Sequence, residues 1–491
     1  MRECYFCKFE IMATRCIYIV LALTVCLTSL ATRSQDLTDR QPADTSVVTS
    51  KVLQESKVTI RNIVVTGNKK TKEHIVKREI PFLEGQAYPM SDILASLPKS
   101  RLNLINTSLF VDASVDFTNW YNDSLDILVD VKERWYWFPI PIFKPVDRNW
   151  NVWINQYNVS FDRVNYGLKF MGRNISGRND NLTVFIQSGY TKLLQVTYVN
   201  PYLGKSLKHG FSVDMSFGRN REVNYTTRNN EQMFYKSNSN FGRDRLMIGG
   251  GYSYRKGSIE RHNVKLNYTL EKVVDSVLYY NPKYFGGGGP TQGFPELLYT
   301  YQYLGVNYFP YPTKGFRWDF AFLKRGISKP MNMWYFNVKA AKYWPLPAKF
   351  FVSVQGEFNL KVPFDQPFYN QALLGYGDTY LRGLEYYVVD GVAGGMLRTT
   401  LRKQIFDIKW KTGFNSRAYG SIPFKIFIKG YGDMGYAYNK NNVTSNFLTN
   451  RPLYTGGLGI DILTIYDVVF KIEYSFNQLG QRAPFIHMNE F

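Results

Sequence analysis

Cysteine is missing from most of this chain, and that absence limits the chemistry available to it. All four cysteines, Cys4, Cys7, Cys16 and Cys26, lie near the start of a 491-residue sequence. Once the leader that holds them is removed, the chain can form no disulfide and carries no thiol nucleophile. This is common in proteins that cross an oxidising compartment unfolded, where a stray thiol invites wrong pairing.

Long apolar runs are also missing. After residue 31 no stretch is apolar for 18 residues, which argues against membrane-spanning helices. The chain is nevertheless rich in aromatic residues, with 37 Tyr and 35 Phe. A membrane barrel combines these properties, because its strands carry lipid-facing residues at every second position and aromatic girdles at both interfaces. A secreted array of β-sandwiches is equally rich in Tyr, so composition leaves both readings open.

Histidine is scarce, and no catalytic motif is visible. The four histidines, His74, His209, His262 and His487, are scattered without ligand spacing. No Gly-x-Ser-x-Gly or His-Glu-x-x-His run occurs, and residues 286–290 lack the Lys-Ser/Thr of a phosphate-binding loop. We therefore expect no enzyme activity, no cofactor and no metal site. A lipase-like barrel with a Ser-His pair remains the enzymatic alternative.

The N-terminus has the order of a secretory signal peptide. Arg15 precedes an apolar run over residues 16–30, and small residues follow at Ser29, Ala31 and Ser34. We assign residues 1–34 to the signal and residues 35–56, rich in Asp, Thr and Ser, to a flexible tether. Translation starts at Met1 or at Met12.

Acidic residues are outnumbered, and the formal charge is +21. The leader holds four Lys/Arg against two Asp/Glu, so about +19 remains after cleavage. A secreted chain has no access to nucleic acid, so we expect phosphorylated lipid headgroups or acidic polypeptide segments as counterparts.

Residues 57–133 predict a small α+β domain with the order strand, helix, helix, strand, strand. The first strand carries Val58, Ile60, Ile63 and Val65, and a helix runs from Thr71 to about Ile80 with Ile75 and Val76 buried. A second helix starts at Ser91 and points Ile93, Leu94, Leu97, Leu102 and Leu104 inward. Pro98 predicts a kink or a break in it. Apolar and polar residues alternate in the last two strands, at 111–117 and 125–131.

This domain resembles a POTRA domain, the periplasmic module of BamA/TamA-like proteins. The matching positions are Ile63, Gly67, Asn68, Thr71, Ile75, Gly85, Leu102, Leu109, Phe110 and residues 129–133. Two features depart from the pattern, namely Pro98 and the replacement of the usual Gly before the second strand by residues 106–108. A small extracellular α+β domain of another kind is the alternative.

Residues 134–491 contain about sixteen or seventeen strand-like segments of roughly 22 residues each with their loops, where a bilayer crossing needs ~9–11 residues per strand. We predict an all-β transmembrane barrel of about 16 antiparallel strands after the POTRA domain. The last strand carries Phe485 and ends on Phe491, as the final strands of bacterial outer-membrane barrels do.

A Gly-rich interruption around residues 373–390 predicts an inward-folded loop. Its tip, Leu381, Arg382, Gly383 and Leu384, resembles the Leu/Val-Arg-Gly-aromatic tip of BamA/TamA-like barrels. An exposed loop arginine is the alternative, whereas a buried one needs an anionic partner.

The resemblance assigns that role to Asp433, which stands with Gly435 in an aromatic-x-Asp-x-Gly strand. Where relatives often carry an acidic residue, this chain has Arg402, which predicts that a third acidic member of the lumenal network is missing.

The resemblance to BamA/TamA-like proteins implies a role in outer-membrane protein insertion or polypeptide translocation. Clients would add to the POTRA strand at Val111, Ala113, Val115 and Phe117 and to the seam between the first and last barrel strands. Expected partners are unfolded outer-membrane or secreted polypeptides, outer-membrane lipid, and periplasmic or lipoprotein accessory subunits. The expected location is the bacterial outer membrane with the POTRA domain in the periplasm. A dedicated exporter and a passive pore are the alternatives.

Overall fold

A computed structural model describes residues 57–145, 160–204, 206–237, 241–257, 259–327, 329–411, 421–441, 445–464 and 467–489. The predicted signal peptide and tether, and Phe491, lie outside the described residues.

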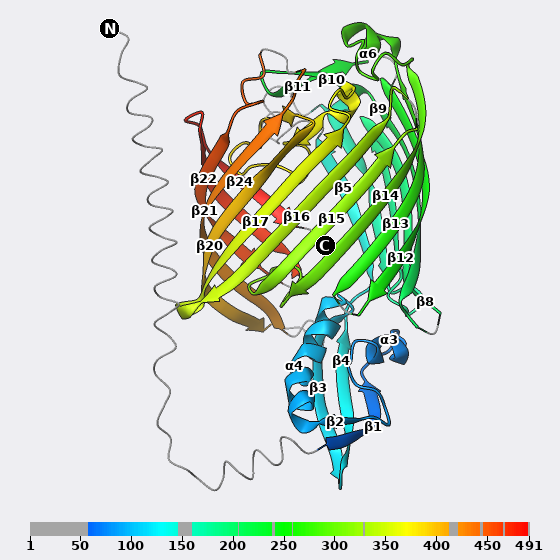
Figure 1. Cartoon of the computed structure of the whole chain (residues 1–491), viewed down its shortest axis with the longest axis vertical. Coiled ribbons are helices and arrows are strands. Elements are labelled where there is room, and N and C mark those ends of the chain that lie inside the picture. Colours follow the sequence, from blue (N-terminus) through cyan, green and yellow to red (C-terminus); the bar gives the residue numbers. More distant parts are fainter. Residues whose placement is uncertain are drawn as a thin grey trace, which may run out of the picture. The chain divides into compact units, whose positions relative to one another are not determined.

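The N-terminal domain is a four-stranded sheet with two helices. Its strands are β1 (Lys57–Thr66), β2 (Ala87–Pro89), β3 (Phe110–Tyr121) and β4 (Ser124–Glu133), and its helices are α3 (Glu73–Lys77) and α4 (Met90–Asn106). The sheet order is β2-β1-β4-β3, with β1 and β4 parallel and β3 antiparallel to β4 (Figure 1). The predicted element order is confirmed, with the short strand β2 as an addition. Because β3 is at the edge of the sheet, one of its sides is free to accept another strand.

The second helix corrects two predictions. Helix α4 continues through Pro98, which excludes the break that was one of the two outcomes predicted there, and Leu94 and Leu102 are 44% and 37% exposed. The buried positions are Met90, Ile93, Ser100 and Leu104. At 100° per residue all of them lie within about 60° of Ile93, whereas Leu102 lies opposite it. The helix therefore buries a narrower stripe than the run of leucines predicted.

The ends of the helices also differ from expectation. Helix α3 is only one turn long and ends at Lys77 rather than near Ile80. After α4 the chain turns through Ser108, whose φ of 60° lies in the left-handed region. Glycine enters that region most easily, so the backbone at Ser108 is strained compared with a glycine at the same position.

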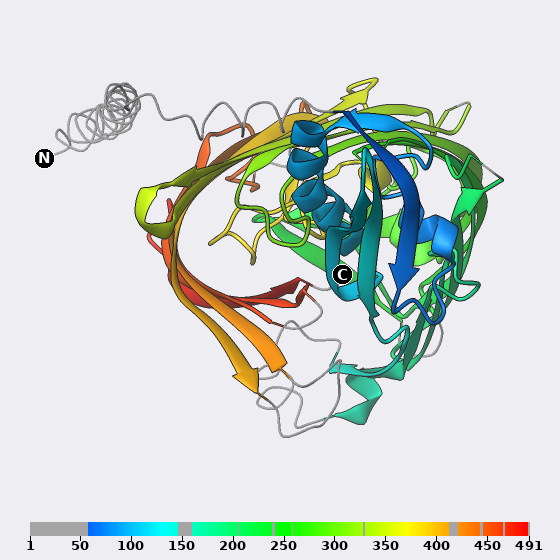
Figure 2. The ribbon, with the colours of Figure 1, turned by 90° about the horizontal axis from the view of Figure 1, so that it is seen from below.

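Sixteen antiparallel strands form the second sheet and confirm the predicted barrel class. They are β5 (Trp137–Pro145), β6 (Val164–Arg173), β7 (Asn181–Gly189), β8 (Thr191–Leu203), β9 (His209–Asn220), β12 (Arg243–Lys256), β13 (Glu260–Val273), β14 (Thr291–Val306), β15 (Gly315–Arg325), β16 (Met333–Leu346), β17 (Phe350–Val362), β20 (Ala393–Lys411), β21 (Ser421–Tyr438), β22 (Leu453–Leu463), β23 (Val469–Asn477) and β24 (Arg482–Asn489). Each strand pairs with the next one in this series, and the sheet curls round on itself (Figure 2).

Two small hairpins and a few short helices interrupt the series. The hairpins are β10 (Glu222–Arg228) with β11 (Glu231–Lys236), and β18 (Ala372–Leu374) with β19 (Val389–Asp390). The helices are α6 (Asp275–Tyr280) and the 3-10 turns η1 (Phe161–Arg163), η2 (Pro347–Lys349) and η3 (Phe368–Asn370). Within the described ranges, no helix is both long enough and apolar enough to cross a membrane.

The barrel strands expose apolar residues and bury polar ones. In β23 the side chains of Phe470, Ile472, Tyr474 and Phe476 are exposed, while those of Glu473 and the serine that follows Tyr474 are buried. Strand β13 repeats the pattern, with exposed Val264, Leu266, Tyr268 and Leu270 alternating with polar residues. A strand in a soluble protein would have the opposite polarity. This alternation is typical of a barrel with lipid outside and a polar lumen inside.

Prolines mark the two ends of the curled sheet, β5 and β24. The Arg173 N–H donates to the Tyr136 carbonyl at 2.8 Å, just before β5 begins. The backbone N–H and carbonyl groups of the even-numbered residues of β5 therefore point toward β6. Backbone groups of successive residues in an antiparallel strand point to opposite edges. The missing N–H groups of Pro139 and Pro141 therefore belong to the free edge of β5.

Strand β24 shows the same arrangement. The Asn477 N–H donates to the Gln481 carbonyl at 3.2 Å, so the odd-numbered residues of β24 face β23. Pro484 consequently has its missing N–H on the free edge. Both ends of the sheet are thus short of hydrogen-bond donors along the sides where they are unpaired.

Candidate functional site: a loop pinned inside the barrel

The loop between β17 and β20 lies on the concave side of the curled sheet (Figure 2). Leu381 and Leu384, on either side of its Arg-Gly pair, are buried. They belong to an apolar cluster with Leu373, Leu374, Val389, Ala437, Leu448 and Leu453. The loop tip is therefore packed against the wall of the barrel. The alternative, an exposed loop arginine, would have required a solvated tip.

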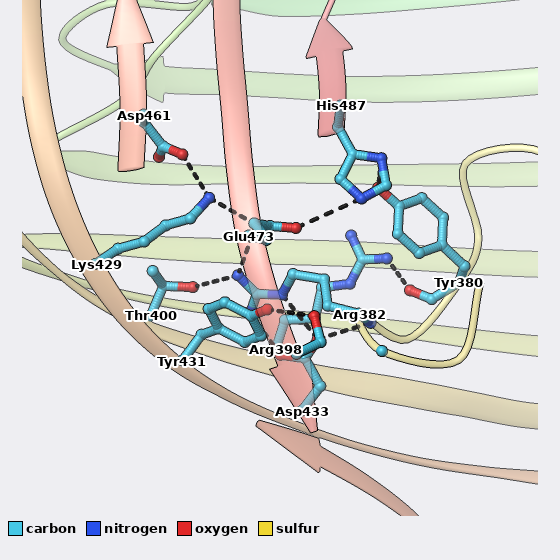
Figure 3. A network of polar contacts seen from close by, with 12 residues as sticks. Tyr380, Arg382, Arg398, Thr400, Lys429, Tyr431, Asp433, Asp461, Glu473 and His487 are labelled. Atoms are coloured by element: carbon cyan, nitrogen blue, oxygen red, sulfur yellow. Dashed lines mark hydrogen bonds and ion pairs between the residues drawn. The ribbon is translucent and has the colours of Figure 1, made fainter. Parts of the chain in front are cut away.

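Arg382 and Asp433 form a two-pronged ion pair (Figure 3). The Nε of Arg382 donates to Asp433 Oδ2 at 2.8 Å, Nη2 donates to Oδ1, and the backbone N–H of Arg382 donates to Oδ2 at 3.2 Å. The two residues are 8% and 3% exposed. Two parallel bonds fix the orientation of the guanidinium as well as its position. The structure thus places the two residues singled out in the sequence in direct contact.

Further contacts complete the surroundings of the guanidinium. Its Nη1 donates to Thr400 Oγ1 at 3.1 Å, and its carbon lies 3.9 Å from the centre of the Tyr431 ring. Burial lowers the pKa of Arg382, whereas the hydrogen bond to Asp433, the charge of Asp433 and the nearby Glu473 and Tyr431 raise it, and the net change is a rise. The guanidinium therefore stays charged inside the barrel.

Two glycines allow the loop to approach the wall. A Cβ on Gly435 would lie 2.9 Å from Leu381 Cδ1 and 3.2 Å from the Gly395 carbonyl oxygen. Gly383 has a φ of 94°, and a Cβ there would lie 2.9 Å from that of Ser475. A side chain at either position would push the tip away from Asp433.

The network contains a third carboxylate, contrary to the prediction drawn from Arg402. Glu473 from β23 lies 3.9 Å from Arg382 and bonds Lys429 at 2.6 Å, and Lys429 also pairs with Asp461 (Figure 3). Arg402 itself is buried beside Tyr311 and donates to the Pro312 carbonyl at 3.0 Å. Glu473 stands in β23, which β21 and β22 separate from β20, so the residue at one position in β20 does not reveal it.

A polar cavity of about 800 Å³ adjoins this network. Its charged lining comprises Arg317, Arg382, Arg398, Arg402, Lys429, Lys471, Asp378, Asp461, Asp467 and Glu473. Cations outnumber carboxylates, so the lumen next to the loop favours acidic groups.

The predicted client strand of the POTRA domain is only partly available. Ala113 and Val115 are buried, so their side chains belong to the domain core, whereas Phe117 is 36% exposed. The Ala113 N–H donates to Asp112 Oδ1 at 2.9 Å, and its carbonyl accepts from Arg101 at 2.7 Å. The backbone N–H and carbonyl of Ala113 therefore point to the free edge of β3, and so do those of Val115 and Phe117, which lie two and four residues further on. At Ala113 these groups already have hydrogen-bond partners.

Of the two aromatic residues predicted to mark the C-terminal strand, the structure describes one. Phe485 lies in β24, with its ring 5.5 Å from that of Tyr386 in the loop and 6.4 Å from that of His487. Phe491 is outside the described residues. Phe485 thus packs against the pinned loop, a contact that sequence reasoning did not foresee.

Comparison with known sequences identifies the N-terminal domain. Residues 58–134 match the POTRA family, described as surface antigen variable number repeat. No curated protein sequence matches the chain.

Comparison with solved structures identifies the fold. CdiB from Escherichia coli matches over 89% of this chain and 75% of its own, at 12% sequence identity and a TM-score of 0.53. BamA from Haemophilus ducreyi lacking POTRA domains 1–3 matches over 93% and 96%, at 14% identity and a TM-score of 0.49. CdiB from Acinetobacter baumannii matches over 88% and 73%, at 10% identity and a TM-score of 0.47. At such identities the likeness to the Escherichia coli protein shows a shared fold.

Proposed function

We propose that this chain, which has the POTRA-plus-barrel architecture of BamA/TamA-like proteins, inserts polypeptides into the bacterial outer membrane or moves them across it. The observation that carries the proposal is the loop held inside the barrel by Arg382 and Asp433. A passive pore gains nothing from filling its own lumen with a buried ion pair. A protein that must open for a client and otherwise stay closed gains a plug.

The POTRA domain supplies the place where a client binds first. Strand β3 is at the edge of its sheet, and its free side beyond Ala113 has backbone groups to offer. An extended segment can pair there by β-augmentation, which reads backbone rather than sequence. The surplus of cations in the lumenal cavity then favours acidic segments of the client.

One observation favours export of a partner over insertion of barrels. Insertion through the seam requires that β5 or β24 pair with an incoming strand along its free edge. Pro139 and Pro141 remove donors from that edge of β5, and Pro484 removes one from β24. A client strand would form few hydrogen bonds along these edges. Export of a partner protein through the lumen is therefore the second candidate function, and the prolines favour it over insertion through the seam.

Depletion of the protein tests the proposal. We expect loss of outer-membrane barrels if the chain is an insertase, and loss of one secreted protein if it is a dedicated exporter, measured by quantitative proteomics of membranes and medium. Unchanged proteomes together with altered solute uptake would refute both and identify a pore. Planar-bilayer recording gives a quick check, because the plugged wild type should conduct little and the Arg382→Glu variant more.

A further inference from the structure

Three side chains of metal-binding type meet beside the pinned loop. Glu385 comes from the loop, Glu473 from β23 and His487 from β24. His487 Nε2 lies 3.4 Å from Glu385 Oε1 and 3.5 Å from Glu473 Oε2, and all three atoms lie within 4.8 Å of one another. Figure 3 shows the Glu473 carboxylate and the His487 ring facing each other across this point.

These three atoms have no hydrogen-bond partner among the described residues. Oε1 of Glu385, Oε2 of Glu473 and Nε2 of His487 are all buried and unbonded, and Glu473 is only 2% exposed. The second oxygen of each carboxylate is occupied, because Glu385 Oε2 accepts the Gly383 N–H at 2.7 Å and Glu473 Oε1 binds Lys429. Buried polar atoms are rarely left unbonded, so a convergent trio requires an explanation.

The imidazole of His487 is held with one nitrogen directed into the cluster. Its Nδ1 lies 3.3 Å from the Tyr380 hydroxyl, and its ring stacks on the Tyr380 ring at 5.2 Å. When Nδ1 carries the proton and donates to that hydroxyl, Nε2 presents a lone pair. A hydrogen bond of this kind on the other ring nitrogen is what orients metal-binding histidines.

We propose that Glu385, Glu473 and His487 bind a divalent transition-metal ion of the zinc class. A tetrahedral ion with bonds of about 2.1 Å separates its ligand atoms by about 3.4 Å, which matches both histidine–carboxylate distances. One imidazole and two carboxylates supply three ligands and leave the fourth position to water. Calcium and magnesium prefer oxygen ligands alone, so the imidazole selects against them.

Two cations lie next to the site, and both are held in ion pairs. Lys429 pairs with Oε1 of Glu473 at 2.6 Å and also with Asp461, and Arg382 pairs with Asp433. The carboxylate oxygens directed to the site are the other ones, Oε1 of Glu385 and Oε2 of Glu473. The site is therefore not a lone acidic cluster beside unpaired cations.

A bound ion would join three parts of the barrel that are not consecutive in sequence. It would link the last strand β24 both to its neighbour β23 and to the loop three residues beyond Arg382. Since β24 is at the open end of the sheet, the ion would hold that end against the loop. This inference does not depend on what the barrel transports.

The test is a titration of the purified full-length protein, without a histidine tag and freed of metal by a chelator. Zn²⁺ should bind with one equivalent, whereas Mg²⁺ and Ca²⁺ should not compete. His487→Phe, which keeps the stacked ring but has no nitrogen, and Glu385→Gln should each abolish that equivalent. Tyr380→Phe should weaken binding about 10-fold, as the loss of an outer-shell partner does.

Two controls decide the outcome. His262→Phe removes a histidine that pairs with Tyr299 elsewhere in the barrel, and it should bind zinc as the wild type does. Zinc should also slow amide hydrogen exchange in residues 482–489 and 380–388 of the wild type and leave residues 60–66 unchanged. Absence of a zinc equivalent, or an equal one in both ligand variants with native gel mobility, overturns the proposal.

Discussion

Arg382 is held by geometry as well as by charge. Its guanidinium is bonded by both oxygens of Asp433 and by Thr400, and its carbon lies over the Tyr431 ring. Removing one partner of such a buried pair leaves the other charge without compensation, which costs about 3–5 kcal/mol. A lysine would keep the charge but would lose the two-pronged bond and the stacking on the ring.

We expect Arg382→Glu to destabilise the barrel, because it places a carboxylate against Asp433 and Glu473. The temperature at which the folded barrel loses its fast mobility in a detergent gel should fall. Arg228→Glu, at an exposed position of β10, should leave it unchanged. Normal stability and activity of the Arg382→Glu protein would show that the pair does not lock the loop.

Exchange of the two charges should restore stability only in part. In Arg382→Glu/Asp433→Arg the pair is re-formed with opposite polarity, so the gel transition should recover toward the wild type. The new carboxylate would still lie beside Glu473, which is 3.9 Å from the present guanidinium. Full independence of the two substitutions, with their effects simply adding, would contradict direct coupling.

Gly435 gives a second prediction at the scale of one residue. Gly435→Ala should cost about 1–3 kcal/mol, since the new methyl group would press on Leu381 in a packed cluster. Gly432→Ala on the same strand is the matched control, because a Cβ there would meet only the Thr455 oxygen at 3.9 Å. The same assay measures both, and equal effects would show that the loop is free to yield.

The resemblance predicted the residues at the centre of the site and missed those around it. Arg382 and Asp433 stand in short motifs that can be recognised in a single sequence. Glu473, Lys429 and His487 stand in strands where a polar residue at every second position is the rule, so nothing singles them out. Only the strand order, which brings β21 to β24 together, shows that they meet.

At the scale of elements, the edge strand β3 is the feature with consequences. Its odd-numbered residues address the free side, and Ala113 is already satisfied by Asp112 and Arg101. The client pairing proposed above would therefore be restricted to the part of the strand from Val115 onward. A cap of this kind protects an edge strand from unwanted pairing.

Phe117→Pro should reduce client binding, because it removes an N–H from the free edge while leaving the ladder with β4 intact. Phe117→Thr loses the same ring but keeps the N–H, so it should bind like the wild type. Binding of unfolded barrel peptides can be followed by fluorescence anisotropy with the full-length protein. Equal loss in both variants would assign the effect to the ring and not to the backbone.

Alternation predicted the strands well because one face of each is buried. Strands β3 and β4 were found where the sequence alternates, although β3 extends to Tyr121. The second helix was less predictable, since a run of leucines does not say which of them face the sheet. Leu94 and Leu102 remained outside because the sheet covers only the face of Ile93 and Leu104.

At the scale of the molecule, length and strand spacing were enough to predict a barrel of about sixteen strands, since each crossing consumes a similar length of chain. They were not enough to predict how the sheet ends. Closure of the barrel depends on which edge of β5 and of β24 lacks N–H donors. The register of each strand with its neighbour decides this, and the hydrogen bonds to the carbonyls of Tyr136 and Gln481 show that register.

Pro139→Val/Pro141→Val should strengthen the seam by restoring two donors to the free edge of β5. We expect a higher gel-transition temperature, and more disulfide formation between single cysteines placed in β5 and β24. Transport should fall if the seam must open. Phe138→Val/Ile140→Val, at neighbouring positions that face β6, is the control. An unchanged transition temperature would show that the prolines do not govern the seam.

The prolines also bear on what the surrounding lipid can tolerate. Hydrocarbon offers no hydrogen bonds, so an unpaired N–H at the rim of an open barrel costs several kcal/mol. A proline has no such group to leave unpaired. Pro139, Pro141 and Pro484 therefore lower the solvation cost of a gap in the wall, so that a barrel with an unzipped side can persist in a bilayer without being driven shut.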